Sequence, residues 1–366
     1  MKYNWQFTDW PSFKYSIEDL HQALYQYAQL SGKVTRSLES LDETIRQDAI
    51  IEKMVEEAIK TSKIEGEVFN PEDIRSSIRN CLNLNHPNIR IVDPKAEGIA
   101  NLMLSLHDTY NKSLTETMLF EWHKLIFKED KYTQLKLGQW RDTKEPMQII
   151  SGAIGREKIY FEAPPSNIVP REMATFINWF NRIDANSIPG PVRAGIAHIY
   201  FESIHPFEDG NGRIGRAISE KILSQDLGYP SIFSLSNVLY KHRKEYYARL
   251  NEASHTLEIT PWLTFFVNVV FEAQKESEQE IKYIVLKANF WKRHKDSLNE
   301  RQTKVLQRMF KEGSKGFQGG ISARNFMTIV DCSKATATRD LGEMVEKGCL
   351  RKLTASGRST SYEINL

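Results

Sequence analysis

Apolar residues recur every three or four positions through most of the chain, beginning near its amino end. Leu20, Leu24 and Tyr27 follow this spacing, and the pattern continues toward position 66. Such spacing places apolar side chains on one face of a helix. We therefore predict helix almost throughout 17–66, interrupted at 30–33 by the sequence Leu-Ser-Gly-Lys. The same period predicts further helices that begin near Pro71, Lys95 and Thr115, and others over 170–184, 191–205, 212–227, 236–253 and 261–290.

The period changes between positions 145 and 165. Two short β-type runs, 147–150 and 158–161, flank a glycine-containing loop, and Pro164 and Pro165 end the second run. This pattern predicts one β-hairpin in an otherwise helical chain. Since a lone hairpin is only marginally stable in water, we expect it to pack on the helices or to serve as an edge for another segment.

A third pattern covers the last part of the chain, from position 298. It predicts an amphipathic helix over 300–310, a second helix over 322–330, a short turn and a third helix over 334–348. Two strands around a Gly-Arg tip complete the segment. Helix, turn, helix and hairpin in this order are typical of a winged helix-turn-helix domain.

The composition is that of an ordinary globular protein, with 366 residues, 40% apolar and 26% charged. This length suits two or three domains. The formal net charge of +2 conceals an uneven distribution, because residues 299–366 hold 12 lysines and arginines against 7 acidic residues. A basic terminal domain on a slightly acidic body is a weak indication of nucleic-acid binding.

The cysteines and the apolar runs indicate the compartment in which the protein works. Cys81, Cys332 and Cys349 are too scattered for a disulfide framework or a metal knuckle, which favours a reducing compartment. The amino-terminal residues lack the apolar segment of a signal peptide. The longest apolar stretch, 262–271, is too short to span a bilayer. We therefore expect a cytoplasmic protein with no membrane segment.

The run HPFEDGNGRIGR, residues 205–216, stands between two predicted helices. Its glycines resemble those of a surface turn, but the loop ends at a helix amino terminus, where free N–H groups and the helix dipole attract anions. Gly210 and Gly212 permit a close approach to the backbone. Arg213 and Arg216 are three positions apart and share a helix face, which suits a polyphosphate.

Two further side chains of this run have a chemical role in the same interpretation. Asp209 offers the oxygen ligand that Mg²⁺ prefers beside phosphates. His205 can take a proton from an incoming hydroxyl. Each of these residues alone has an ordinary structural explanation, as a helix end, a turn or a solvated face. Their combination between two buried helices predicts a nucleotide-phosphate site with its own base.

The run resembles the signature of the Fic family, His-Pro-Phe-x-Asp/Glu-Gly-Asn-Gly-Arg-x-x-Arg, at every specified position, and the similarity extends over roughly 110–270. The resemblance implies a mostly helical enzyme that transfers AMP from ATP to a protein hydroxyl. It implies that His205 is the general base and that Asp209 binds Mg²⁺. It further implies that Gly210, Asn211 and Gly212 form the anion hole, and that Arg213 and Arg216 bind the β- and γ-phosphates. Phe207 would anchor the loop in the core. It implies an adenine pocket lined by Tyr246 and Tyr247, although core packing explains either tyrosine equally well. Glu208 falls at the variable position and receives no role.

The sequence Thr-Ser-Lys-Ile-Glu-Gly at 61–66 resembles the inhibitory motif of the same family, Ser/Thr-x-x-x-Glu-Gly/Asn. This resemblance implies that Glu65 pairs with Arg216 and holds ATP in an unproductive pose. The alternative is a plain helix end closed by Gly66. The hairpin at 145–165 is similar to the family's flap, which implies docking of an extended segment of a target protein. The amino-terminal residues resemble a poorly understood domain that precedes some Fic proteins.

We therefore predict a mainly α protein with a Fic-type helical core, one β-hairpin flap and a carboxy-terminal winged helix-turn-helix domain. The predicted regions are 1–110, with an inhibitory helix at about 45–66, then a catalytic core over 111–290 and a winged-helix domain over 298–366. The predicted function is an autoinhibited protein adenylyltransferase that uses ATP and Mg²⁺ on a Ser, Thr or Tyr hydroxyl of a target protein.

Three questions stay open at this point. The protein is alternatively a Fic variant that transfers another group or removes AMP, or a nucleotide-sensing DNA-binding regulator. The winged helix either contacts DNA or serves as a scaffold for protein contacts, and a homo-oligomer is equally compatible with the sequence. The residues with which the winged helix would contact DNA are Lys334, Thr336, Thr338, Arg339 and Arg358.

Overall fold

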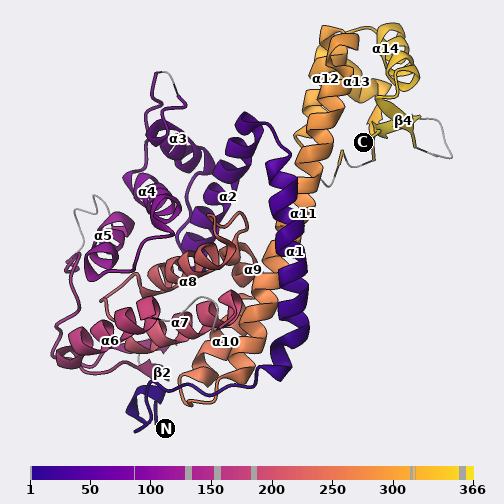
Figure 1. Ribbon diagram of the computed structural model, residues 1–366. Helices are drawn as coiled ribbons and strands as arrows, with labels where there is room; N and C mark the ends of the chain where they lie inside the picture. Colours follow the sequence, from indigo (N-terminus) through magenta and orange to yellow (C-terminus); the bar gives the residue numbers. More distant parts are fainter. Residues whose placement is uncertain are drawn as a thin grey trace. The chain divides into compact units, whose positions relative to one another are not determined.

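The computed structural model describes residues 2–85, 87–127, 134–151, 158–182, 188–313, 316–317, 319–353 and 360–366. The chain divides into two compact units, and helices predominate in both (Figure 1). The first unit contains Met1–Gly32 and Gln47–Ser277, and the second contains Lys33–Arg46 and Glu278–Leu366.

The first unit is built from eleven of the described helices, of which α1, α2 and α11 also have residues in the second unit. These helices are α1 His21–Glu39, α2 Glu43–Ile64, α3 Pro71–Cys81, α4 Pro94–Thr109, α5 Glu116–Ile126, α6 Val169–Arg182, α7 Gly190–Ile204, α8 Asn211–Leu227, α9 Leu235–Lys241, α10 Arg243–Ala253 and α11 Thr260–His294.

Helix α7 forms the centre of the first unit. Nearly every residue from Gly190 to Ile204 is buried, so this helix is covered by other parts of the unit on all sides. It packs against α8, and α11 approaches it closely at Gly195, where a Cβ atom would lie 2.8 Å from Leu263. Trp262 of α11 also donates a hydrogen bond to the Gly195 carbonyl at 2.8 Å. The end of α7 and the start of α8 are therefore held in a rigid frame.

The prediction of a break at 30–33 was wrong. Helix α1 continues through Ser31 and Gly32 to Glu39, and the chain leaves the helix only before Glu43. Val34 and Leu38 extend the buried face of α1 beyond the glycine. Burial of two such side chains outweighs the roughly 1 kcal/mol that a glycine costs inside a helix. The predicted helix over 236–253 is in fact two helices, α9 and α10, which are separated at His242.

The predicted β-hairpin is present as β1 Gln148–Ser151 and β2 Lys158–Glu162, which pair antiparallel with Gln148 opposite Glu162. Its loop, 152–157, lies outside the described residues. The hairpin packs on the amino-terminal segment, beside which β2 is drawn in Figure 1. The Trp5 indole donates a hydrogen bond to the Glu162 carbonyl at 2.7 Å, and the ring of Tyr3 meets that of Phe161 edge-on.

The second unit contains α12 Glu300–Phe310, β3 Ile321–Ser322, α13 Ala323–Val330, α14 Lys334–Glu346, β4 Leu350–Lys352 and β5 Ser361–Ile364. The three strands form one sheet in the order β3-β5-β4. Strand β3 was not predicted, because two residues are too few to show an alternating pattern. The predicted tip with Arg358 lies outside the described residues. The observed order of helices and strands is compatible with a winged helix, and that assignment stays a prediction.

Helices long and apolar enough to cross a bilayer are absent from the part of the chain that the structure describes.

The buried side chain of Asn4 joins the amino-terminal segment to α7. Its Nδ2 donates to the Ser203 hydroxyl at 2.7 Å and to the Ala253 carbonyl at 3.3 Å. We expect Asn4→Ala to lower the free energy of unfolding by about 1–3 kcal/mol, because two buried acceptors lose their donor. Urea denaturation measures this change. Thr8→Ala, at an exposed position of the same segment, is the matched control, and equal stability of the two variants would contradict the prediction.

Candidate active site

The loop between α7 and α8 begins and ends with left-handed backbone. His205 follows α7 with φ 50° and ψ 60°, and Gly210 precedes α8 with φ 82°. A Cβ atom at Gly210 would also lie 3.0 Å from the ring of Phe127. Glycine therefore suits position 210, because it adopts the left-handed conformation and leaves room for the Phe127 ring. His205 occupies a similar conformation, which few residues with a side chain adopt.

The side chain of Asn211 fixes this loop from inside. Its Oδ1 accepts a hydrogen bond from the Phe207 N–H at 2.9 Å, and its Nδ2 donates to the Phe207 carbonyl at 2.8 Å. Both side-chain groups are therefore engaged with the loop backbone. The N–H group of Asn211 belongs to the first turn of α8, where no helical partner is available, so this group can still meet an anion.

Phe207 and His123 anchor the loop in the core. The fully buried ring of Phe207 stacks on His123 of α5, with ring centres 4.2 Å apart. His123 Nδ1 accepts from the Gly138 N–H at 3.0 Å, so its Nε2 carries the proton and donates to the Asp209 carbonyl at 3.2 Å. Burial lowers the pKa of His123 to about 4, which keeps this ring neutral. The sequence did not single out His123, because one histidine inside a predicted helix has no distinguishing pattern.

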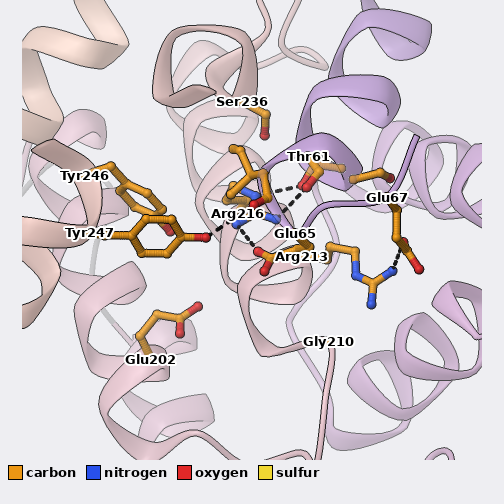
Figure 2. Close-up of polar contacts among 12 residues, drawn as sticks. Thr61, Glu65, Glu67, Glu202, Gly210, Arg213, Arg216, Ser236, Tyr246 and Tyr247 are labelled. Carbon is orange, nitrogen blue, oxygen red and sulfur yellow. Dashed lines mark hydrogen bonds and ion pairs between the residues drawn. The ribbon is translucent and has the colours of Figure 1, made fainter. Parts of the chain in front are cut away.

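Arg216 lies in the core at the end of α2. Its Nη1 is 2.9 Å from Glu65 Oε1, its Nε donates to the Thr61 hydroxyl at 2.7 Å, and its Nη2 donates to the Thr61 carbonyl at 2.9 Å (Figure 2). Burial is the largest single effect and lowers the pKa of Arg216, but the charge and hydrogen bond of Glu65 together with Tyr246 and Tyr247 outweigh it, so the pKa is raised. Three residues that the sequence singled out are thus brought together across about 150 positions of chain.

Arg213 lies one turn earlier on α8 and has a carboxylate of its own. Its Nη1 is 2.5 Å from Glu67 Oε2 (Figure 2). Its guanidinium also covers the ring of Phe127, at 5.0 Å from the ring centre. Immediately before Arg213, a Cβ atom at Gly212 would lie 2.3 Å from Glu65 Oε1. The glycine therefore allows an anionic group to approach the backbone at the start of α8.

A cavity of about 670 Å³ opens in front of this loop. Its volume lies in the range of pockets that hold small ligands. The hairpin region contributes Met147, Ile149, Tyr160 and Phe161 to the lining. Glu65, the first residue after α2, also lines the cavity. The loop contributes His205 and the run from Glu208 to Gly212, and α10 contributes Arg243, Tyr246, Tyr247, Leu250 and Asn251.

His205 lines the cavity as an uncharged imidazole at neutral pH. Burial, with a smaller effect of the Arg141 charge, lowers its pKa to about 4. Arg141 is itself buried and holds the backbone of this turn: its N–H donates to the Pro206 carbonyl at 2.9 Å and its Nε to the His205 carbonyl at 2.7 Å. The sequence did not indicate Arg141, which lies in a loop 64 positions away.

Glu202 is a second ionisable group beside His205 that the sequence did not identify. Its Oε2 lies 3.7 Å from His205 Nδ1, one turn back on α7. Burial, followed by the charge of Glu65, raises the pKa of Glu202 to about 8. The carboxyl group is therefore protonated at neutral pH. Glu202 lies three positions before His205, and this helical spacing was the signal in the sequence that could have identified Glu202.

The two tyrosines have different environments. Tyr246 is buried, and its hydroxyl is 2.8 Å from His198 Nε2, so it is also part of the core. Tyr247 is 42% exposed and presents its ring to the cavity beside Arg243. Of the two, Tyr247 is the more accessible to a ligand.

Asp209 is the acidic residue of the loop that faces solvent at the cavity. One of its oxygens, Oδ1, accepts from the Gly210 N–H. Within the described ranges, no three histidine, cysteine or acidic side chains gather into a site that would hold a metal ion by protein ligands alone. Asp209 is therefore a single exposed carboxylate beside the amino end of α8.

Comparison with known proteins gives two family matches. Residues 113–223 match the Fic/DOC family, and residues 3–84 match a domain of unknown function, DUF4172. A probable protein adenylyltransferase of Aquifex aeolicus is 37% identical over 93 residues, which are 25% of this chain and 26% of that protein. Protein adenylyltransferase Fic of Nematostella vectensis is 30% identical over 102 residues, 28% of this chain and 22% of that protein. The chain thus spans about a quarter of these relatives.

Solved structures share the fold over longer ranges. A Fic family protein from Desulfovibrio desulfuricans has a TM-score of 0.57 at 17% identity, covering 100% of this chain and 98% of that one. Fic-1 from C. elegans has a TM-score of 0.52 at 21% identity, covering 74% of each chain. At these identities the likeness concerns the fold alone.

The raised pKa of Glu202 predicts a pH dependence of stability. The folded protein keeps a proton that the unfolded chain, with a carboxyl pKa near 4.5, releases, so this group's contribution to stability falls as pH rises from about 4.5 to about 8. Glu202→Gln removes this dependence. We expect its melting temperature to exceed that of the wild type by roughly 2–6 °C at pH 8 and by less at pH 5.

Differential scanning calorimetry at the two pH values checks this expectation. Glu208→Gln, which removes a neighbouring carboxylate that also lines the cavity, is the matched control. A difference between Glu202→Gln and wild type that is the same at pH 5 and pH 8 would show that Glu202 does not hold its proton in the folded state.

Proposed function

We propose that the protein is an autoinhibited adenylyltransferase that transfers AMP from ATP to a Ser, Thr or Tyr hydroxyl of a target protein, because residues 113–223 match the Fic/DOC family. The observation that carries this proposal is the cavity lined by the uncharged His205, the exposed Asp209 and the first residues of α8, the helix that also holds the buried Arg213 and Arg216. The partial relatives from Aquifex aeolicus and Nematostella vectensis, both named protein adenylyltransferases, support it.

In the proposed reaction, the hydroxyl oxygen of the target forms a bond to the α-phosphorus of ATP. The bond between that phosphorus and the oxygen bridging to the β-phosphate breaks, and pyrophosphate leaves. His205 takes the proton of the attacking hydroxyl, which its low pKa allows because the imidazole is unprotonated at neutral pH. The N–H groups of Asn211 and Gly212 and the guanidiniums of Arg213 and Arg216 would hold the phosphates and offset the developing charge.

A magnesium ion suits this site through Asp209. Mg²⁺ commonly binds to one or two carboxylates together with substrate phosphates, so a single exposed carboxylate beside the phosphate-binding loop fits this ion. When bound, the ion would neutralise charge on the phosphoryl oxygens. The adenine ring would lie against Tyr247, with Tyr246 behind it.

The flap would present the target protein. Ile149, Ile159 and Tyr160 are partly exposed apolar side chains on the hairpin. In the described part of the chain β1 pairs with β2 alone, so its other edge is open to an extended segment. Such a segment would place its hydroxyl group at the mouth of the cavity near His205.

Autoinhibition would follow from the position of Glu65. Its carboxylate occupies Arg216, the arginine that the proposal assigns to the γ-phosphate, and it lies against the backbone at Gly212. ATP could then bind only in a pose that does not expose the α-phosphorus to attack.

A second candidate function concerns the carboxy-terminal unit. Lys334, Thr338 and Arg339 are exposed on α14. We propose that this face contacts DNA phosphates and the major groove. A role of this unit as a protein scaffold is the alternative.

Removal of the inhibitory carboxylate should activate the enzyme. We expect Glu65→Gly to raise auto-modification with labelled ATP by about tenfold or more, because Arg216 becomes free for the γ-phosphate. Adding Arg216→Ala should remove the gain, and adding His205→Ala should abolish transfer. The measurement is a labelled-ATP gel of all variants.

Glu65→Gln is the matched variant that removes the charge without a second glycine beside Gly66, and thermal melts report whether each variant is folded. A folded Glu65→Gly protein no more active than wild type contradicts autoinhibition. Unchanged transfer in the His205→Ala background removes the proposed base.

DNA binding by the second unit should depend steeply on salt, because cations are released from the phosphates. We expect the full chain to shift duplex DNA at low salt, with affinity lowered roughly three- to tenfold by Arg339→Ala. Fluorescence anisotropy over a salt series measures both effects. Arg308→Ala is the control, because Arg308 is an exposed arginine of α12 that pairs with Glu312 just after the helix. No binding at low salt would leave the unit as a scaffold.

A further inference from the structure

The segment after α2 brings two carboxylates, not one, to α8. Helix α2 ends at Ile64, and the next three residues are Glu65, Gly66 and Glu67. Gly66 has φ 88°, and the N–H groups of Glu65 and Glu67 both donate to the Ser62 carbonyl, at 3.1 and 3.0 Å. This tight turn allows both glutamates to face the same helix, and Figure 2 shows each at its own arginine.

The second contact is as well formed as the first. Glu67 Oε2 lies 2.5 Å from Arg213 Nη1, and Glu65 Oε1 lies 2.9 Å from Arg216 Nη1. The inhibitory motif accounts for Glu65 alone. Glu67 falls outside it, yet it meets the other arginine that the proposed function assigns to the phosphates.

Burial of the four side chains is unequal. The side chains of Arg213 and Arg216 are 4% and 1% exposed, whereas those of Glu67 and Glu65 are 30% and 31% exposed. A carboxylate that leaves this site is readily solvated, but a buried guanidinium left without a counter-charge is costly. The two positions can therefore exchange a carboxylate for another anion, and they cannot easily stay empty.

We propose that Glu67 is a second inhibitory carboxylate, which competes with the β-phosphate of the nucleotide for Arg213. Glu65 and Glu67 together then imitate the terminal phosphates of ATP, one at each arginine. This inference rests on the proposed function, because it takes Arg213 and Arg216 as phosphate ligands. It adds that inhibition acts on the affinity for the nucleotide as well as on its pose.

The proposal makes the effect of Glu67 depend on the number of phosphates. AMP has no phosphate for Arg213 and should bind without displacing Glu67. ADP and ATP should each compete with Glu67, and only ATP should compete with Glu65 as well. Loss of Glu67 therefore improves the binding of ADP, whereas loss of Glu65 does not.

Isothermal titration calorimetry with AMP, ADP and ATP in the presence of Mg²⁺ tests this on the full chain. We expect Glu67→Gln to raise the affinity for ADP and ATP by about fivefold to tenfold and to leave that for AMP unchanged. Glu65→Gln should raise the affinity for ATP alone. Glu72→Gln, which removes a largely exposed carboxylate paired with Arg75 on the neighbouring α3, is the matched control and should change none of the three.

Glutamine keeps the volume of Glu67 and an oxygen that can accept from Arg213, and unchanged AMP binding shows that the variant is folded. Equal ADP affinity in wild type and Glu67→Gln, with AMP bound by both, overturns the inference and leaves the proposed function intact. Failure of all three nucleotides to bind to any variant overturns both. Raised ADP affinity without AMP transfer by Glu65→Gly supports the inference and rejects the proposed enzyme.

Discussion

Two guanidinium groups enclosed at the start of α8 determine how the first unit is assembled. A buried charge costs several kcal/mol unless it is paired, and the positive end of the helix dipole adds to the requirement for anions. Arg213 and Arg216 obtain these anions from a segment about 150 positions earlier in the chain. The charge balance of α8 therefore explains why α2 is held against it.

Other contacts of α2 strengthen this arrangement without using the cavity. Glu57, buried within α2, accepts hydrogen bonds from the Ser234 hydroxyl at 2.7 Å and from the Ser236 N–H at 2.9 Å at the start of α9. The ammonium groups of Lys60 and Lys63, on α2, lie over the ring of Tyr240, which belongs to α9. Helix α2 is thus attached to α9 by contacts that do not involve Glu65 or Glu67, so an anion could displace these two glutamates while α2 stays docked.

The sequence predicted well what depends on local pattern. The period of apolar residues indicated most helices and the hairpin, and the loop chemistry could be interpreted from the order of its glycines and charges. The failure at 30–33 shows the limit of this approach, because Val34 and Leu38 outweigh a glycine only through burial in the folded chain. Contacts between remote segments had no local signal, which is why Arg141 and His123 were missed.

Glu65 and Glu67 illustrate the same limit within one segment. The position of Glu65 was expected only because a motif was recognised, and Glu67 looked like any surface glutamate two residues beyond it. Its role in the structure comes from the turn at Gly66 and from a buried arginine far along the chain.

The left-handed backbone at His205 sets folding and chemistry against each other at one position. Asparagine or glycine adopts this conformation more easily, and for other residues it costs roughly 1–2 kcal/mol. Selection for thermal stability alone would therefore favour replacement of the histidine. In a library selected for stability alone, glycine at position 205 would relieve this strain, and the base of the proposed reaction would be lost without a loss of folding.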